Sequence, residues 1–185
     1  MGKFPWVFVV VLTLPALVLA QHHHSPYAGQ ERHAMKSLSE EEIQALFSGQ
    51  GMGLAKAAEL NHYPGPRHVL DLAAQLQLSE TQRAETQKIY DRMHQEAVRL
   101  GALLVDKEQE LDRLFATATV NSDNLPSLVK QIAQLHGDLR LVHLQAHVDM
   151  KRLLSREQIA TYDALRGYAT AAGPASQTWP RQHQH

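Results

Sequence analysis

A five-residue phrase occurs twice in this chain, and each copy stands at the start of a segment with helical periodicity. The two copies are Leu78-Ser79-Glu80-Thr81-Gln82 and Leu154-Ser155-Arg156-Glu157-Gln158. A Ser followed three residues later by Gln is a capping box, in which each side chain satisfies a backbone N–H of the first helical turn. A third box, with Glu in place of Gln, spans residues 38–42. The three boxes predict helices that begin at Glu40, Glu80 and Arg156.

Two long amphipathic segments follow from the spacing of the apolar residues. From Glu80 to about Ala118, and again from about Pro126 to Leu154, apolar residues recur at steps of three and four, which places them on one face of a helix. The polar residues 121–124 between the segments are typical of a turn. The sequence therefore predicts an all-α fold, a long antiparallel helical hairpin, with short flanking helices at about 40–47, 54–61, 66–76 and 156–168.

The composition indicates one small helical domain and excludes several function classes. The 185 residues include no Cys, and 18 basic residues nearly balance 19 acidic ones, so we expect no nucleic-acid partner. The chain has no Gly-rich phosphate loop, no Cys nucleophile and no Gly-x-Ser-x-Gly. We therefore expect no enzymatic activity and no required cofactor.

The first twenty residues are typical of a secretory signal peptide. Lys3 precedes an almost wholly apolar run, and small residues lead up to a cleavage site after Ala20. An uncleaved N-terminal membrane anchor is the alternative. Residues 21–36 are predicted to be a flexible arm that contains histidines, residues 37–168 the helical domain, and residues 169–185 a disordered tail.

The long apolar stripes also predict an oligomer. Few short helices are available to cover the hairpin, so part of each stripe stays exposed unless a second subunit packs on it. We expect a homodimer, with a monomeric bundle as the alternative.

Histidine is unusually frequent, and its positions suggest metal binding. Four candidate ligands lie within about 60° of arc on the second long helix: His136, His143, His147 and Met150. Imidazole and thioether together suit zinc, nickel, cobalt or copper. A second candidate is chelation by the chain ends, through His22, His23, His24, His183 and His185. The alternative is that the helical histidines only border a packed seam.

The signal peptide, the two motifs and the hairpin between them resemble the Spy/CpxP family of periplasmic proteins. The motif residues are Leu78, Ser79 and Gln82 in the first copy and Leu154, Ser155 and Gln158 in the second, with Ser where the family more often has Thr. The segments 51–66 and 162–168 also look like those of many members. The resemblance implies a cradle-shaped antiparallel dimer in the periplasm, and it includes a heavy-metal sensor and resistance branch.

Two functions are therefore expected. The first is ATP-independent chaperoning of unfolded or misfolded envelope proteins as part of an envelope stress response, with an envelope stress-signalling protein as a further partner. The alternative is a periplasmic sensor or scavenger of heavy metals. The first requires an exposed apolar surface rimmed by charge, and the second requires the helical or terminal histidines.

Overall fold

The computed structural model of the protein describes residues 25–33 and 35–168. The predicted signal peptide at 1–20, the terminal histidines at 22–24, 183 and 185, and the predicted disordered tail at 169–185 lie outside these residues. The chain divides into two compact units, residues 1–33 and 34–185. Among the described residues of the first unit, Gln30–Arg32 form one turn of 3-10 helix, η1, with no buried side chain.

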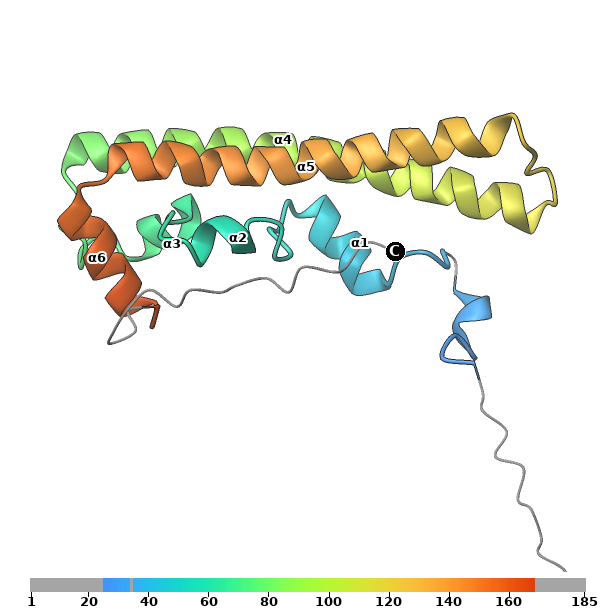
Figure 1. The fold of residues 1–185 in the computed structure, drawn as a ribbon, viewed down its shortest axis with the longest axis horizontal. Helices are drawn as coiled ribbons and strands as arrows, with labels where there is room; N and C mark the ends of the chain where they lie inside the picture. Colours follow the sequence, from blue (N-terminus) through green and yellow to red (C-terminus); the bar gives the residue numbers. More distant parts are fainter. Residues whose placement is uncertain (1–24, 34, 169–185) are drawn as a thin grey trace, which may run out of the picture. The chain divides into compact units, whose positions relative to one another are not determined.

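The second unit is built on the predicted helical hairpin, which is confirmed. Helix α4, Glu80–Ala116, and helix α5, Asn124–Leu153, pack antiparallel and side by side (Figure 1). The turn between them is held by Asn121, whose side-chain oxygen accepts hydrogen bonds from the backbone N–H groups of Asp123 and Asn124, both at 2.9 Å. A polar turn of this kind reverses the chain without burying unsatisfied backbone groups.

Four short helices flank the hairpin: α1 at Glu40–Phe47, α2 at Lys56–Glu59, α3 at Pro66–Asp71 and α6 at Arg156–Leu165. Figure 1 shows α1, α2 and α3 in a row along the α4–α5 pair, with α6 at the end where α4 begins. The regular structure of residues 25–33 and 35–168 is therefore wholly helical, as predicted.

Three of the short helices end earlier than the sequence pattern predicts, and among them α6, predicted to reach about residue 168, ends at Leu165. The segment predicted as helix 54–61 has only four helical residues, and the segment predicted as 66–76 stops at Asp71. Gln77 takes a left-handed conformation, with φ 50°, and the N–H of Leu78 donates to the carbonyl of Ala73 at 3.0 Å. This bond closes a Schellman-like turn that directs the chain into the first motif.

The core of the second unit begins inside the segment predicted as an arm. Met35 is only 7% exposed and packs with the α1, α4 and α5 side chains of one apolar cluster. Lys36 pairs with Asp112 of α4 at 3.3 Å. Residues 35 and 36 are therefore anchored to the hairpin, and a Met at this position supplies the apolar area that holds them there.

A close backbone contact fixes α1 on α4. A Cβ atom at Gly101 would lie 2.3 Å from the carbonyl oxygen of Leu46, so only glycine allows this approach.

A second apolar cluster joins α3, α5 and α6 around Val69, Met150 and Tyr162. No helix within residues 25–33 and 35–168 is long and apolar enough to cross a membrane.

Candidate functional site

The two sequence motifs form the predicted helix caps. The hydroxyl of Ser79 accepts from the N–H of Gln82 at 3.1 Å, and that of Ser155 accepts from the N–H of Gln158 at 3.2 Å. Each Gln side chain in turn accepts from the N–H of its Ser. The side chains of Gln82 and Gln158 also hydrogen bond to each other, at 2.9 and 3.0 Å, which sequence reasoning did not foresee. The motifs therefore join α4 to α6 besides starting them.

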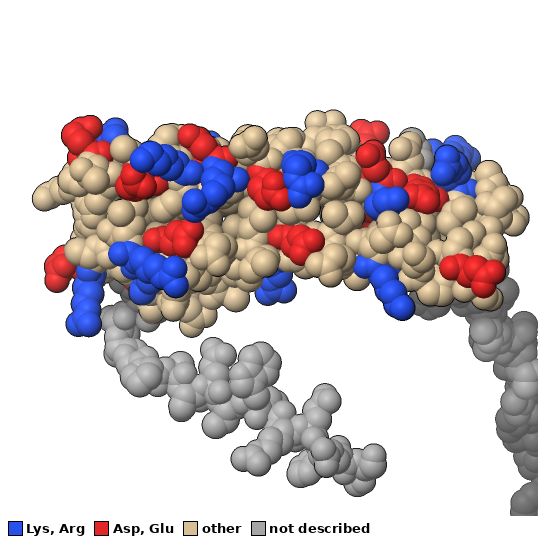
Figure 2. Space-filling view, turned by 90° about the horizontal axis from the view of Figure 1, so that it is seen from above, with Lys and Arg blue, Asp and Glu red and all other residues tan. Residues whose placement is uncertain are grey.

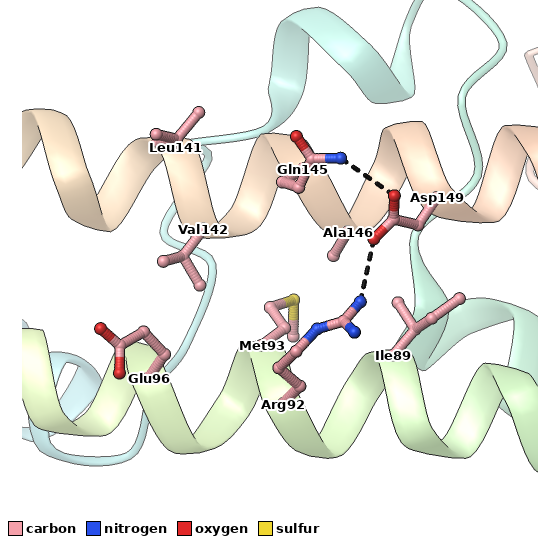
Figure 3. A pocket seen from close by; sticks show the side chains of 9 residues that line it. All are labelled: Ile89, Arg92, Met93, Glu96, Leu141, Val142, Gln145, Ala146 and Asp149. Atoms are coloured by element: carbon pink, nitrogen blue, oxygen red, sulfur yellow. Dashed lines mark hydrogen bonds and ion pairs between the residues drawn. The ribbon is translucent and has the colours of Figure 1, made fainter.

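A hollow of about 290 Å³ lies between the two long helices, and we call it the apolar hollow. Its apolar lining comes from both helices: Ile89, Met93, Leu141, Val142 and Ala146. Figure 3 shows it on the face of the α4–α5 pair away from the short helices, which lie behind the pair in that view. Leu141 is 60% exposed, so the edge of the hollow presents a large apolar side chain to solvent.

Charged side chains of both signs surround this hollow. Arg92 donates to Asp149 across the two helices at 2.9 Å, and Gln145 donates to the same carboxylate at 2.9 Å (Figure 3). Glu96 is hydrogen bonded to Arg99, and this bond lowers the pKa of Glu96 below its ordinary value. The hollow is thus an apolar floor with a rim of acidic and basic side chains.

A second hollow, of about 640 Å³, is lined by four histidines from three helices, and we call it the histidine hollow. His68 comes from α3, His94 from α4, and His143 and His147 from α5. Met93 lines this hollow as well as the apolar one. Of the two predicted helical ligands that face it, His143 is 3% and His147 is 8% exposed.

Hydrogen bonds to backbone carbonyls determine which ring nitrogen of His147 and of His94 carries the hydrogen. Nδ1 of His147 lies 2.7 Å from the carbonyl oxygen of Tyr63, and Nε2 of His94 lies 3.2 Å from that of Ser48. A carbonyl only accepts, so each of these ring nitrogens carries the hydrogen. Nε2 of His143 is buried with no hydrogen-bond partner within the described part of the chain. Burial, and then the nearby His147, lower the pKa of His143, which keeps its ring neutral at neutral pH.

The four predicted helical ligands do not converge. His136 is largely exposed and lies 4.0 Å from Glu108, while Met150 is fully buried in the apolar cluster around Tyr162. Only His143 and His147 share a hollow. Within residues 25–33 and 35–168, no group of three or more His, Asp or Glu side chains is arranged to hold a metal ion. The structure therefore brings two of the four together and leaves the other two apart.

A buried polar network around Glu59 was missed by sequence reasoning. The Tyr162 hydroxyl donates to Glu59 at 2.5 Å, and the side chains of Arg166 and His147 lie 3.5 and 3.6 Å from its carboxylate. Burial, and then the hydrogen bond to Glu59, raise the pKa of Tyr162. No local pattern marks these residues, because Glu59 sits in a helix of four residues and meets partners about a hundred positions away.

The chain matches none of the protein-family models, curated proteins or solved structures with which it was compared. The resemblance to the Spy/CpxP family thus rests on the signal peptide, the two motifs, the hairpin and the segments 51–66 and 162–168.

Proposed function

We propose that this protein is an ATP-independent chaperone that captures unfolded proteins through their apolar side chains. The apolar hollow is the observation that carries the proposal. It offers Ile89, Met93, Val142 and the exposed Leu141 to a ligand, on a helix pair that needs no rearrangement to present them. A hollow of about 290 Å³ is sufficient for one or two apolar side chains of an unfolded chain.

The charge pattern around the hollow favours broad recognition. Figure 2 shows basic and acidic side chains interspersed along the α4–α5 pair. At the hollow, Arg92 pairs with Asp149 at 2.9 Å. A mixed surface neither attracts nor repels clients of one sign. The flexible thioether of Met93 in the floor lets one hollow accept side chains of different shape.

We propose a homodimer as the working form. Several large apolar side chains outside the apolar hollow are 40% exposed or more, among them Leu103, Phe115 and Val129 of the hairpin. A second copy of the hairpin would cover part of this surface. The resemblance to the Spy/CpxP family supports a cradle-shaped dimer, a periplasmic location after cleavage near Ala20, and unfolded envelope proteins as clients. Light scattering that gives a monomer at micromolar concentration would contradict the dimer.

The proposal is tested by an aggregation assay without ATP. At stoichiometric amounts the protein should suppress aggregation of a chemically unfolded client, followed by turbidity. Leu141→Glu should weaken this suppression, because a carboxylate at the edge of the hollow must lose water when a client binds. Leu165→Glu is the matched control, since Leu165 is a 48% exposed apolar residue of α6 that neither lines the hollow nor lies on the hairpin surface proposed for the dimer.

Light scattering and circular dichroism on both variants separate a lost client site from a changed oligomer or lost helix. Equal suppression by Leu141→Glu and by the unmodified protein would remove the apolar hollow as the client site. Absence of suppression with several clients would reject the chaperone function itself. Metal handling is the alternative function, and among its candidate ligands His143 and His147 line one hollow.

A further inference from the structure

The apolar hollow leaves apolar side chains of both long helices open to solvent. Its floor contains Met93 and Val142, and Leu141 at its edge is 60% exposed. Its volume of about 290 Å³ is sufficient for one large aromatic side chain. A single bulky group that enters the hollow would therefore remove this surface from water.

The rim of the hollow carries polar groups that suit an indole ring. The carboxylates of Glu96 and Asp149 and the guanidinium of Arg92 all stand at the hollow (Figure 3). An indole donates one hydrogen bond through Nε1–H, and its ring face attracts a guanidinium. Leu offers neither interaction, and Phe has no donor. Trp is therefore the side chain that matches both the floor and the rim.

The chain carries such a side chain in the segment that follows the last described residue. Trp179 is the only large apolar residue in the C-terminal segment, residues 169–185. This segment contains no Asp or Glu, and Arg181 stands two positions after Trp179. The two carboxylates at the rim outnumber its one guanidinium, so the rim favours a segment with basic and without acidic side chains.

The C-terminal segment starts close to the hollow. Tyr168, the last described residue, packs against the apolar cluster around Tyr162, and so does Ile89, which lines the hollow. Trp179 follows Tyr168 by eleven positions, and a chain of that length spans at most about 36–40 Å. A short tether holds its end at an effective concentration on the order of 1 mM, so even a weak contact is populated.

We propose that the C-terminal segment binds back onto the hairpin of its own chain and places Trp179 in the apolar hollow. The segment then competes with unfolded clients for the same floor. This regulation rests on the proposed function, because it requires that the hollow be the client site. The apparent affinity for a client falls in proportion to the fraction of molecules whose hollow is open.

The position of Trp179 is measured by its fluorescence without a client. The chain has two Trp, so Trp6→Phe leaves Trp179 as the single emitter. Its emission should lie at shorter wavelength than that of a synthetic peptide of residues 169–185, and acrylamide should quench it several-fold less. Leu141→Glu should return the emission to the value of the peptide. Leu165→Glu, at an exposed residue of α6 outside the hollow, should leave it unchanged.

A nitroxide label locates Trp179 without changing the floor of the hollow. The chain has no Cys, so Gln145→Cys in the Trp6→Phe chain gives a single labelling position on an exposed residue of the rim. A nitroxide there should quench most of the Trp179 emission, because it acts only at short range. The same label on Leu165→Cys is the control and should quench less.

Competition with clients is measured in the aggregation assay. Trp179→Ala should lower the amount of protein that gives half-maximal suppression by at least about twofold, because it frees the hollow. Gln177→Ala is the matched control in the same segment and should leave that amount unchanged. If neither the unmodified protein nor Trp179→Ala suppresses aggregation, the chaperone proposal fails, whereas the fluorescence of Trp179 still decides where the segment binds.

Three results would overturn the proposal. The first is Trp179 emission equal to that of the peptide, and the second is emission that responds to Leu165→Glu and not to Leu141→Glu. The third is suppression that Trp179→Ala leaves unchanged or weakens. Circular dichroism checks that Leu141→Glu keeps its helix content. If it does not, quenching by the nitroxide at Gln145→Cys decides, and its absence overturns the proposal.

Discussion

Gln82 and Gln158 hydrogen bond to each other through both side-chain amides, although 76 residues separate them. Nε2 of Gln82 also donates to the carbonyl of Leu153 at 3.2 Å, and Nε2 of Gln158 donates to that of Leu76 at 3.2 Å. Each Oε1 meanwhile accepts from the N-cap N–H of its own helix. One pair of side chains thus caps two helices and links α4, α6 and the chain segments that precede them.

Replacing Gln82 by Glu separates these two roles. Glu keeps the acceptor that completes a capping box, but it cannot donate to Gln158 or to Leu153. We expect Gln82→Glu to lower the free energy of unfolding by about 1–3 kcal/mol, since partly buried acceptors lose their donor. Urea unfolding followed by circular dichroism measures the change.

Glu42→Gln is the control for this prediction. Glu42 occupies the same position in the first capping box, where its carboxylate accepts from Ser39 at 2.8 Å and makes no hydrogen bond to a distant residue within the described part of the chain. Gln completes the box as well, so only the interaction of the charge with the helix end is lost, which is below about 1 kcal/mol. Equal stability of Gln82→Glu and the unmodified protein would show that the amide pair contributes nothing.

Gly101→Ala should destabilise the protein although it favours helix. The new Cβ would lie 2.3 Å from the carbonyl oxygen of Leu46 and 2.8 Å from its carbon, so α1 would have to move away from α4. We expect a loss of about 1–3 kcal/mol from this overpacking, against a gain in helix propensity of about 1 kcal/mol. Thermal and urea unfolding report the net effect.

Gly137→Ala supplies the matched control on the partner helix. Gly137 is exposed within α5, and a Cβ atom there would meet nothing within 4 Å. The same substitution should therefore stabilise the protein by about 1 kcal/mol. If both variants are stabilised, α1 does not pack on α4 as closely as the structure shows.

Ionisation of Tyr162 should occur only on unfolding. Its pKa is raised in the folded state, by burial and then by the hydrogen bond to Glu59. The stabilisation from a neutral Tyr162 is therefore complete below the unfolded pKa of about 10 and is lost as the pH rises through the higher folded value. Stability should fall above about pH 10 for this reason.

Tyrosinate absorbance measures this ionisation directly. At pH 11, folded samples of the unmodified protein and of Tyr162→Phe should give the same tyrosinate absorbance. Unfolding in denaturant at that pH should then release one additional tyrosine equivalent in the unmodified protein alone. An excess of one equivalent already present in the folded protein would mean that Tyr162 is accessible and not held by Glu59.

The sequence by itself determined where the helices start and how the hairpin runs. The capping boxes at Ser39, Ser79 and Ser155 act within four residues, and the apolar period of α4 and α5 is read along one segment, so neither depends on the rest of the chain. The end of α3 was less predictable, because the left-handed turn at Gln77 competes with an apolar pattern that continues to Leu76.

Only the tertiary structure decided which side chains meet. Helical spacing alone placed His143 and His147 together. The packing of α4, α3 and α6 on α5 puts Met93 in the same hollow and buries Met150 in the apolar cluster around Tyr162 instead. Tyr162 and Glu59 are 103 residues apart and meet because α6 folds back beside the end of α2. Periodicity states which face of a helix is apolar, whereas contacts between helices depend on how those faces pack together, and no single segment carries that information.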